Sequence, residues 1–159
     1  MNIPFSPLEK TLEVVAALGL VLSIIIVFQS WSMLPDTIPT HFGASGKPDG
    51  WGGKETILLL PVLSIFLIYI PFVFLSRYPH IYNYICPITE QNVVEQYYLA
   101  RSLLGWMKAE IIWLFAGLEW QTVQTALGKS EGLGMLTWPP LLIIFGTIGI
   151  YMYKSYQAR

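Results

Sequence analysis

Three residues in one short stretch have side chains that could do chemistry. The stretch Leu34–Lys54, LPDTIPTHFGASGKPDGWGGK, places Asp36, His41 and Asp49 between two strongly apolar segments. An imidazole beside carboxylates can bind a divalent metal ion or carry out general acid–base catalysis. The spacing matches no HExxH motif, no EF-hand loop and no nucleophile–base set. The three residues are therefore weak candidates for a divalent metal site, and we expect no other cofactor.

Turn-forming chemistry explains most of this stretch. Proline pushes the residue before it towards extended geometry, and glycine permits a positive φ. Aspartate side chains can bond their own backbone in turns. We therefore expect an ordered loop held by hydrogen bonds. Its structural or ligand-binding residues are Pro35, Asp36, Pro39, His41, Phe42, Gly46, Asp49 and Lys54.

A second set of polar residues lies in a later, largely apolar segment. At 100° per residue, Arg101, Lys108 and Glu119 fall within about 20° of one another on a helix, whereas Glu110 points to the opposite side. Each needs a partner, water or a neighbouring subunit, because a charge at mid-bilayer costs about 2.5–3.5 kcal/mol. The alternatives are a proton relay, an ion path, a ligand counter-charge or a structural contact, with snorkelling also open to Arg101 and Lys108.

The composition of the chain indicates that these residues are carried by membrane helices. The 159 residues are 54% hydrophobic and 12% charged, against about 25% charged in a soluble domain. Residues 14–35, 56–76 and 132–153 contain no Asp, Glu, Lys or Arg, and about 20 such residues cross a bilayer as a helix. Residues 89–127 have no proline and are too apolar for a soluble loop, so we predict a further span there.

The predicted fold is all-α, a polytopic membrane protein with four transmembrane helices in a single integral membrane domain over residues 1–159. Pro35 ends the first helix, Pro61 and Pro71 predict a kink in the second, and Thr89 is the expected N-cap of the third. The predicted spans are residues 8–33, 55–76, 98–127 and 137–153, with an ordered extracytoplasmic loop at 34–54.

The distribution of basic residues predicts the orientation. With the amino terminus inside, Lys10, Arg77, Arg101, Lys154 and Arg159 are cytoplasmic, whereas Lys47, Lys54 and Lys129 are outside. This majority favours two cytoplasmic termini. A net charge of −1 without a basic run argues against nucleic-acid binding. The single cysteine, Cys86, cannot form a disulfide within the chain.

The loop also resembles a known pattern. The run LPDTIPTHF at residues 34–42, followed by Gly46-x-x-Asp49 and Lys54, resembles a bacterial membrane domain of unknown function found at the amino end of the sporulation-delaying-protein immunity family. The chain differs from that pattern at Gly43, where an asparagine is expected, and lacks the additional carboxy-terminal spans of the full immunity protein. The resemblance implies a multi-pass inner-membrane protein that protects a cell from its own secreted peptide toxin.

These observations predict a non-enzymatic protein of a bacterial cell membrane that binds, neutralises or senses a membrane-active peptide. The expected partners are the lipid bilayer and a secreted peptide toxin or another membrane protein, and a homo-oligomer would also satisfy the charged stripe. Two alternatives remain open. One is a membrane metal-dependent hydrolase that uses Asp36, His41 and Asp49, and the other is a proton- or ion-coupled transport component that uses Glu119 and Lys108.

Overall fold

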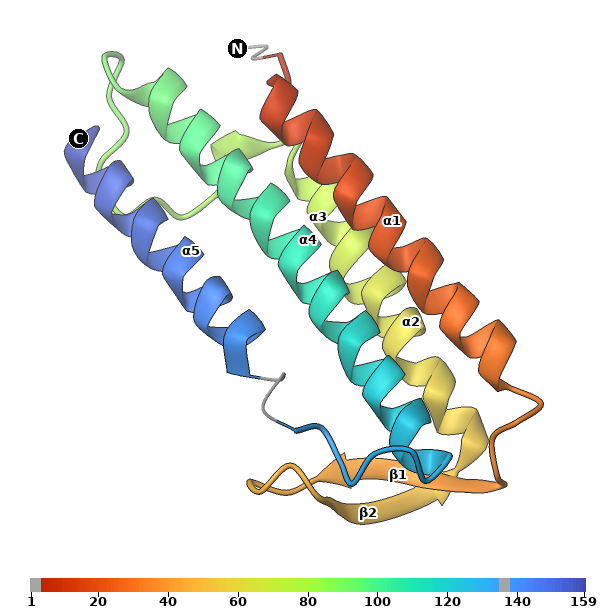
Figure 1. The fold of residues 1–159 in the computed structure, drawn as a ribbon. Coiled ribbons are helices and arrows are strands. Elements are labelled where there is room, and N and C mark those ends of the chain that lie inside the picture. Colours follow the sequence, from red (N-terminus) through yellow and green to blue (C-terminus); the bar gives the residue numbers. More distant parts are fainter. Residues whose placement is uncertain (1–3, 135–137) are drawn as a thin grey trace.

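The computed structural model describes residues 4–134 and 138–159 as a set of long helical rods with a β-hairpin at one end (Figure 1). Both termini lie at the end opposite the hairpin. The start of the predicted fourth span, residue 137, lies outside the described residues. The elements are α1 (Pro7–Ser30), β1 (Thr37–Phe42), β2 (Pro48–Gly53), the 3-10 helix η1 (Lys54–Leu58), α2 (Leu59–Leu63), the π-helix η2 (Ser64–Tyr69), α3 (Ile70–Leu75), the 3-10 helix η3 (Pro79–Ile81), α4 (Val93–Ala126) and α5 (Trp138–Gln157).

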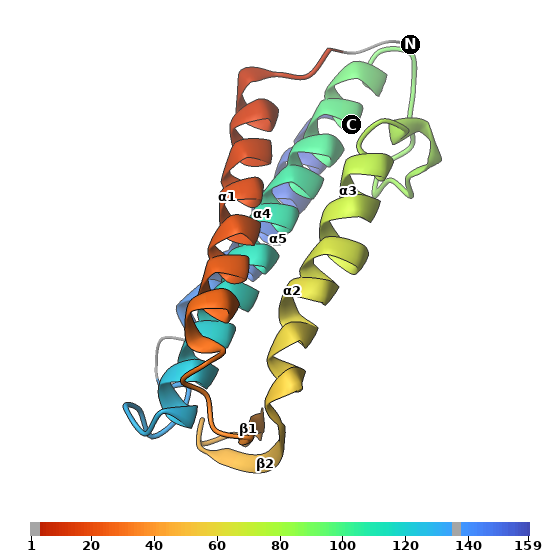
Figure 2. The same ribbon diagram turned by 90° about the vertical axis from the view of Figure 1, so that its right-hand side faces the viewer.

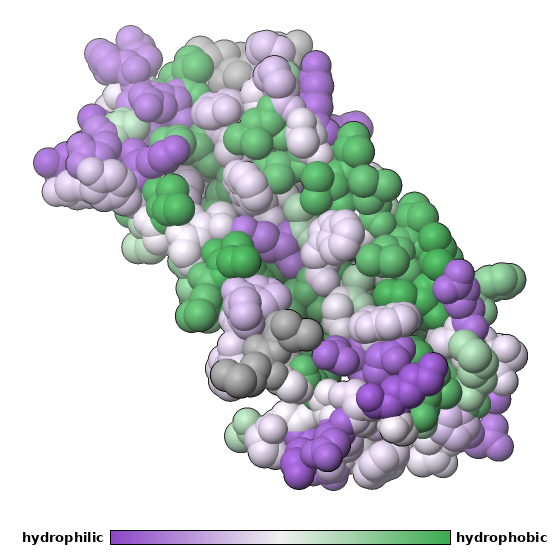
Figure 3. Space-filling model, in the orientation of Figure 1, coloured by the Kyte–Doolittle hydropathy of each residue, from purple (hydrophilic) through white to green (hydrophobic). Residues whose placement is uncertain are grey.

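Two helical segments in the described part of the chain are long and apolar enough to cross a membrane. They are Pro7–Ser30 and Lys54–Leu75, and they correspond to the predicted spans at 8–33 and 55–76. Hydrophobic side chains gather over the middle of the molecule, and many hydrophilic ones lie towards its two ends (Figure 3). The long helix α4 and the helix α5 lie beside these segments (Figure 2).

The limits of α1 follow from local hydrogen bonds. Ser6 and Glu9 form a capping box around Pro7, which occupies the first turn. The helix ends at Ser30, three residues before the predicted end at residue 33. The Ser30 hydroxyl donates to the carbonyl of Ile26 at 2.7 Å, and a turn leads from there to Leu34.

The segment Lys54–Leu75 changes its hydrogen-bonding pattern along its length. It starts as the 3-10 helix η1, and the π-helix η2 separates α2 from α3. Pro71 is the second residue of α3, after Ile70, and has no backbone N–H to continue an α-helical ladder. The two prolines that predicted a kink thus lie in a segment that combines three helix types.

The structure is mostly helical, but it is not all-α, because the predicted loop at residues 34–54 contains a two-stranded antiparallel hairpin. Thr37 pairs with Gly53 and Phe42 with Pro48, with irregular register around His41. Glycine in β2 makes this pairing possible: a Cβ on Gly50 would lie 2.9 Å from that of His41. Gly50 and Gly52, which were expected in a loop, therefore lie where the two strands approach closely.

Helix α4 begins later than predicted and runs through the centre of the molecule. Thr89 and Asn92 exchange hydrogen bonds in a turn, so the helix starts at Val93 and not after an N-cap at Thr89. The predicted span at 98–127 lies within α4 except for its last residue. The helix runs alongside α1, and both point the same way (Figure 1).

Two apolar clusters join these elements. One lies between α1 and α4 and contains small residues that allow close helix packing. The other holds the hairpin against the ends of the helices, because Ile38 of β1 is buried against it. The first cluster consists of Leu12, Ala16, Ala109 and Ile112, and the second of Ile26, Val27, Leu34, Ile38, Ile57 and Val123.

Candidate functional site

The first basic residue of α4, Arg101, is paired with α1. The Arg101 guanidinium donates to the Glu9 carboxylate from Nε at 2.7 Å and from Nη2 at 2.9 Å, and both side chains are about 95% buried. Arg101 also donates to the carbonyl of Pro4 at 3.0 Å and lies over the ring of Phe5. Such a two-pronged pair is the strong form of a charge-assisted hydrogen bond.

The second charge on the same face is also paired. The Lys108 ammonium donates to the Glu13 carboxylate, and it lies 5.2 Å from the centroid of the Tyr69 ring. The lysine is buried, whereas Glu13 is partly exposed. Lys108 therefore makes a structural contact with α1 in this arrangement.

Two of the acids of α4, Glu110 and Glu119, each keep one carboxylate oxygen without a partner in the described part of the chain. Glu119 is fully buried, and the Ser23 hydroxyl of α1 donates to its Oε2 at 2.5 Å. Glu110 accepts a 2.6 Å hydrogen bond from Thr147 of α5. Glu110 thus faces α5 while Glu119 faces α1, as expected from their helical angles. The remaining oxygens, Oε1 of Glu119 and Oε2 of Glu110, are buried.

The sequence interpretation identified the charges of α4 but missed their partners on α1. Glu9, Ala16, Ser23 and Ser30 recur every seven residues, and all four are buried. A heptad spacing of small and polar residues within an apolar helix marks a face that packs on another helix. That spacing was the available signal for Glu9 and Ser23, whereas Glu13, the partner of Lys108, lies outside it.

The structure does not bring the three candidate metal ligands together. His41 Nδ1 bonds to the Asp49 carboxylate across the hairpin, whereas the exposed Asp36 pairs with Lys54 at 3.2 Å. Within residues 4–134 and 138–159, no group of three or more His, Cys, Asp or Glu could hold a metal ion. The arrangement is a pair of separate polar contacts on an exposed hairpin.

A groove of about 340 Å³ lies beneath the hairpin. His41 lies on β1 at its rim, and its bond to Asp49 through Nδ1 leaves Nε2 as the second hydrogen-bonding atom of the ring. The groove walls are mostly apolar. They come from β1, the start of the segment Lys54–Leu75, α4 and the loop after α4. The lining residues are Ile38, Pro39, Thr40, His41, Phe42, Thr56, Ile57, Leu59, Leu60, Leu118, Thr122 and Leu133.

The remaining loop residues support the hairpin. Gly46 has a φ of 75° in the turn, and its carbonyl accepts a 2.9 Å hydrogen bond from the Leu133 backbone N–H. The backbone N–H of Lys54 donates a 3.0 Å hydrogen bond to the carbonyl of Asp36. Pro39 is fully buried. Pro35 leads from α1 into β1.

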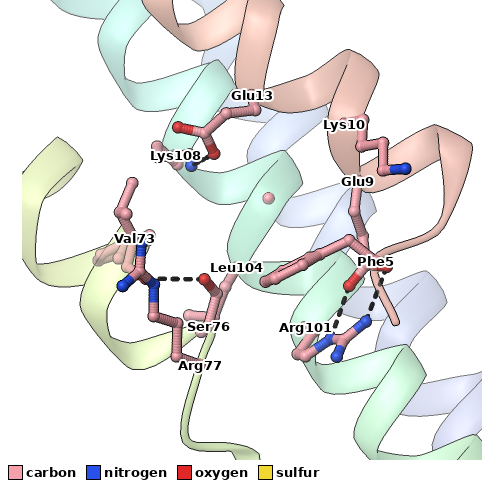
Figure 4. Close-up of a pocket in the computed structure, with 12 residues that line it drawn as sticks. Phe5, Glu9, Lys10, Glu13, Val73, Ser76, Arg77, Arg101, Leu104 and Lys108 are labelled. Carbon is pink, nitrogen blue, oxygen red and sulfur yellow. Dashed lines mark hydrogen bonds and ion pairs between the residues drawn. The ribbon is translucent and has the colours of Figure 1, made fainter. Parts of the chain in front are cut away.

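A second pocket, of about 310 Å³, lies between α1, α3 and α4 near the end that carries the termini. Figure 4 shows the Arg101–Glu9 and Lys108–Glu13 pairs inside it, with Arg77, two residues after α3, to one side and Lys10 on α1 to the other. The nearby segment after α3 is held by tyrosines. Tyr82 donates to the carbonyl of Leu75 at 2.6 Å, and burial raises the pKa of Tyr82 to about 12, so this donor keeps its proton.

Comparison with known proteins finds relatives without an assigned function. Residues 18–65 match a family described as "Domain of unknown function (DUF1648)", and this range includes most of α1 and the whole hairpin. The chain is similar to an uncharacterized protein of Archaeoglobus fulgidus, with 38% identity over 93 residues that cover 52% of this chain and 51% of that protein. The chain thus spans about half the length of this curated relative. No solved structure matches this chain.

Proposed function

We propose that the chain is a multi-pass cell-membrane protein that binds a membrane-active peptide in the groove beneath the hairpin and so protects the cell. This function needs no catalytic step. The groove itself carries the proposal, since it combines an apolar lining with the exposed His41–Asp49 pair at its rim. The motif that resembles the immunity family lies in this hairpin.

The groove offers both attraction and orientation to a peptide. Burying one large apolar side chain contributes about 1.5–3 kcal/mol, and Leu59, Leu60 and Phe42 line the space for it. Nε2 of His41 can hydrogen-bond to the peptide backbone, while Asp49 fixes the orientation of the ring. Apolar anchoring with a polar rim is the usual anatomy of a peptide-binding surface.

The position of the hairpin suits a ligand that arrives along the membrane surface. The hairpin lies between the two segments that are long enough to span, Pro7–Ser30 and Lys54–Leu75. Trp31 and Trp51 are exposed at this end, where their rings match the headgroup region. In this proposal all four rods cross the membrane, and the hairpin faces outwards.

The test is a protection assay in a susceptible bacterium that expresses the chain. Cells are challenged with the secreted peptides of the organism that encodes the chain, and the dose that halves growth is measured. We expect the wild-type chain to raise this dose. His41→Ala and Phe42→Ala should abolish the protection, because they remove the rim contact and one apolar wall.

The matched control is Trp51→Ala, an exposed aromatic residue of β2 that does not line the groove. This variant should protect as well as wild type, with membrane levels of all variants compared by immunoblot. An unprotected wild-type strain would contradict the peptide function. Equal protection by wild type, His41→Ala and Phe42→Ala would remove the function from the groove.

Glu119 favours a second candidate, a proton-coupled transport component. Its carboxylate is fully buried, with one oxygen bonded to Ser23 and the other without a partner among the described residues. A buried acid of this kind can take up and release a proton. This function would be supported if the wild-type chain carries protons into liposomes and Glu119→Gln does not. Lys108 is not part of this candidate site, because it is already paired with Glu13. Equal proton flux in the wild-type chain and in Glu119→Gln would exclude a transport role for Glu119.

A further inference from the structure

The pocket near the termini holds an excess of positive charge. Its lining includes four cationic side chains and two carboxylates. Both carboxylates are in ion pairs, Glu9 with Arg101 and Glu13 with Lys108. Lys10 and Arg77 form no ion pair within the described residues, so these two exposed cations remain available to a ligand at the mouth of the pocket.

The rest of the lining is suited to a hydrocarbon chain. Phe72 and Val73 of α3 and Leu104 of α4 form an apolar wall. Gly105 also lines the pocket and adds no side chain to it. The Leu12 side chain packs closely against this position, where an added Cβ would lie 3.1 Å from Leu12 Cδ1. The hydroxyl of Ser76, next to Arg77 in the chain, lines the same pocket and donates to the Val73 carbonyl at 2.8 Å.

The two free cations flank the candidate spans at one level. Lys10 lies in the first turn of the segment Pro7–Ser30, and Arg77 follows the segment Lys54–Leu75 by two residues. Both positions correspond to the headgroup layer if these segments cross a bilayer. Basic pockets between membrane helices at this depth bind anionic lipid headgroups.

We propose that this pocket binds an anionic phospholipid. Arg77 holds the phosphate, because a guanidinium presents two parallel N–H donors to phosphate oxygens. Lys10 adds attraction from the α1 side, and one acyl chain lies along Phe72, Val73 and Leu104. The proposal rests on the membrane placement of the helices but not on the peptide groove, which lies at the opposite end of the molecule (Figure 1).

The test measures lipid binding to the purified full-length chain. The protein is prepared in neutral detergent, and phosphatidylglycerol or phosphatidylcholine of the same acyl length is titrated while bound lipid is counted by native mass spectrometry. We expect one phosphatidylglycerol per chain, bound about tenfold more tightly than phosphatidylcholine, which corresponds to about 1.4 kcal/mol. The Lys10→Ala/Arg77→Ala double variant should lose this preference.

The matched control is Arg159→Ala, which removes a cation at the same end that does not line the pocket. This variant should keep the preference for phosphatidylglycerol. Equal binding of the two lipids by wild type, or an undiminished preference in the double variant, would overturn the proposal. Inorganic phosphate and glycerol phosphate form a third arm, and displacement of the lipid by either at equal concentration would identify a free-phosphate site instead. Circular dichroism of the double variant should match wild type, since both positions are exposed.

Discussion

The charged residues of α4 are held by a set of contacts that a single substitution can unbalance. Arg101 and Glu9 are both buried, so each satisfies a charge that would otherwise be stranded away from water. Removing one partner of a buried pair is costlier than removing both, because the survivor keeps its desolvation penalty.

Arg101→Ala should therefore lower the free energy of unfolding by about 3–5 kcal/mol. The double variant Arg101→Leu/Glu9→Leu should recover most of this loss, because it leaves no unpaired charge. Unfolding in mixed detergent micelles, followed by circular dichroism, measures both. Lys10→Ala is the control, since Lys10 is an exposed neighbour of Glu9, and a loss as large as that of Arg101→Ala would contradict a specific role for the pair.

At this scale the sequence predicted the need for partners but not their identity. The helical angles of Arg101, Lys108 and Glu119 placed them on one face, and the structure shows that face against α1. Lys108 and Glu119 are eleven residues apart, about 16 Å along a helix, which is too far for a direct pair. They bond separately to Glu13 and Ser23. Which helix supplies the partners depends on the packing of whole helices, and a single helix does not reveal it.

At the scale of elements, close packing between α1 and α4 depends on a glycine. A Cβ on Gly19 would lie 2.8 Å from Cγ2 of Ile112 and 3.1 Å from the ring of Trp113. Ile112 is fully buried and has no room to move away. The two helices therefore approach as closely as they do because this position has no side chain.

Gly19→Ala should reduce the free energy of unfolding by about 1–3 kcal/mol, the usual cost of overpacking. Gly146→Ala in α5 is the matched control, because nothing lies within 4 Å of the added methyl group. That change should be neutral or stabilising by about 0.5–1 kcal/mol, since alanine favours a helix over glycine. The same unfolding assay compares them, and equal effects at the two positions would exclude the close contact.

The hairpin shows where prediction from sequence fails at this scale. Residues 34–54 contain prolines and glycines that are depleted in strands, so the composition indicated a loop. The two strands are instead stabilised by packing of Ile38 and Leu34 on the helix ends, which is a tertiary effect. The positions of α1, α4 and α5 were predictable, because long apolar segments leave few alternatives.

At the scale of the whole molecule, the arrangement of the rods predicts the topology. The hairpin lies at one end, and both termini lie at the other (Figure 1). If all four rods cross the membrane, the hairpin and the termini face opposite compartments. In that arrangement, the excess of Lys and Arg at the terminal end predicts cytoplasmic termini.

Single cysteines test this topology in a Cys86→Ala background. Ser45→Cys in the hairpin turn should react with a membrane-impermeant maleimide in intact cells, because Ser45 is exposed. Gln157→Cys near the carboxy terminus should react only after permeabilisation. Labelling of both positions from the same side would contradict a four-span arrangement, and labelling of Gln157→Cys alone would reverse it.

The pairing of α1 with α4 also means that each acidic residue of α1 is synthesised well before its basic partner on α4. Glu9 is translated 92 residues before Arg101, and Glu13 precedes Lys108 by 95. At about 5–20 residues per second, α1 exists for roughly 5–20 s before its counter-charges are made. If α1 crosses a membrane, its acidic first turns have to stay in contact with water during that interval. The first helix would then reach its final depth only after α4 has been made.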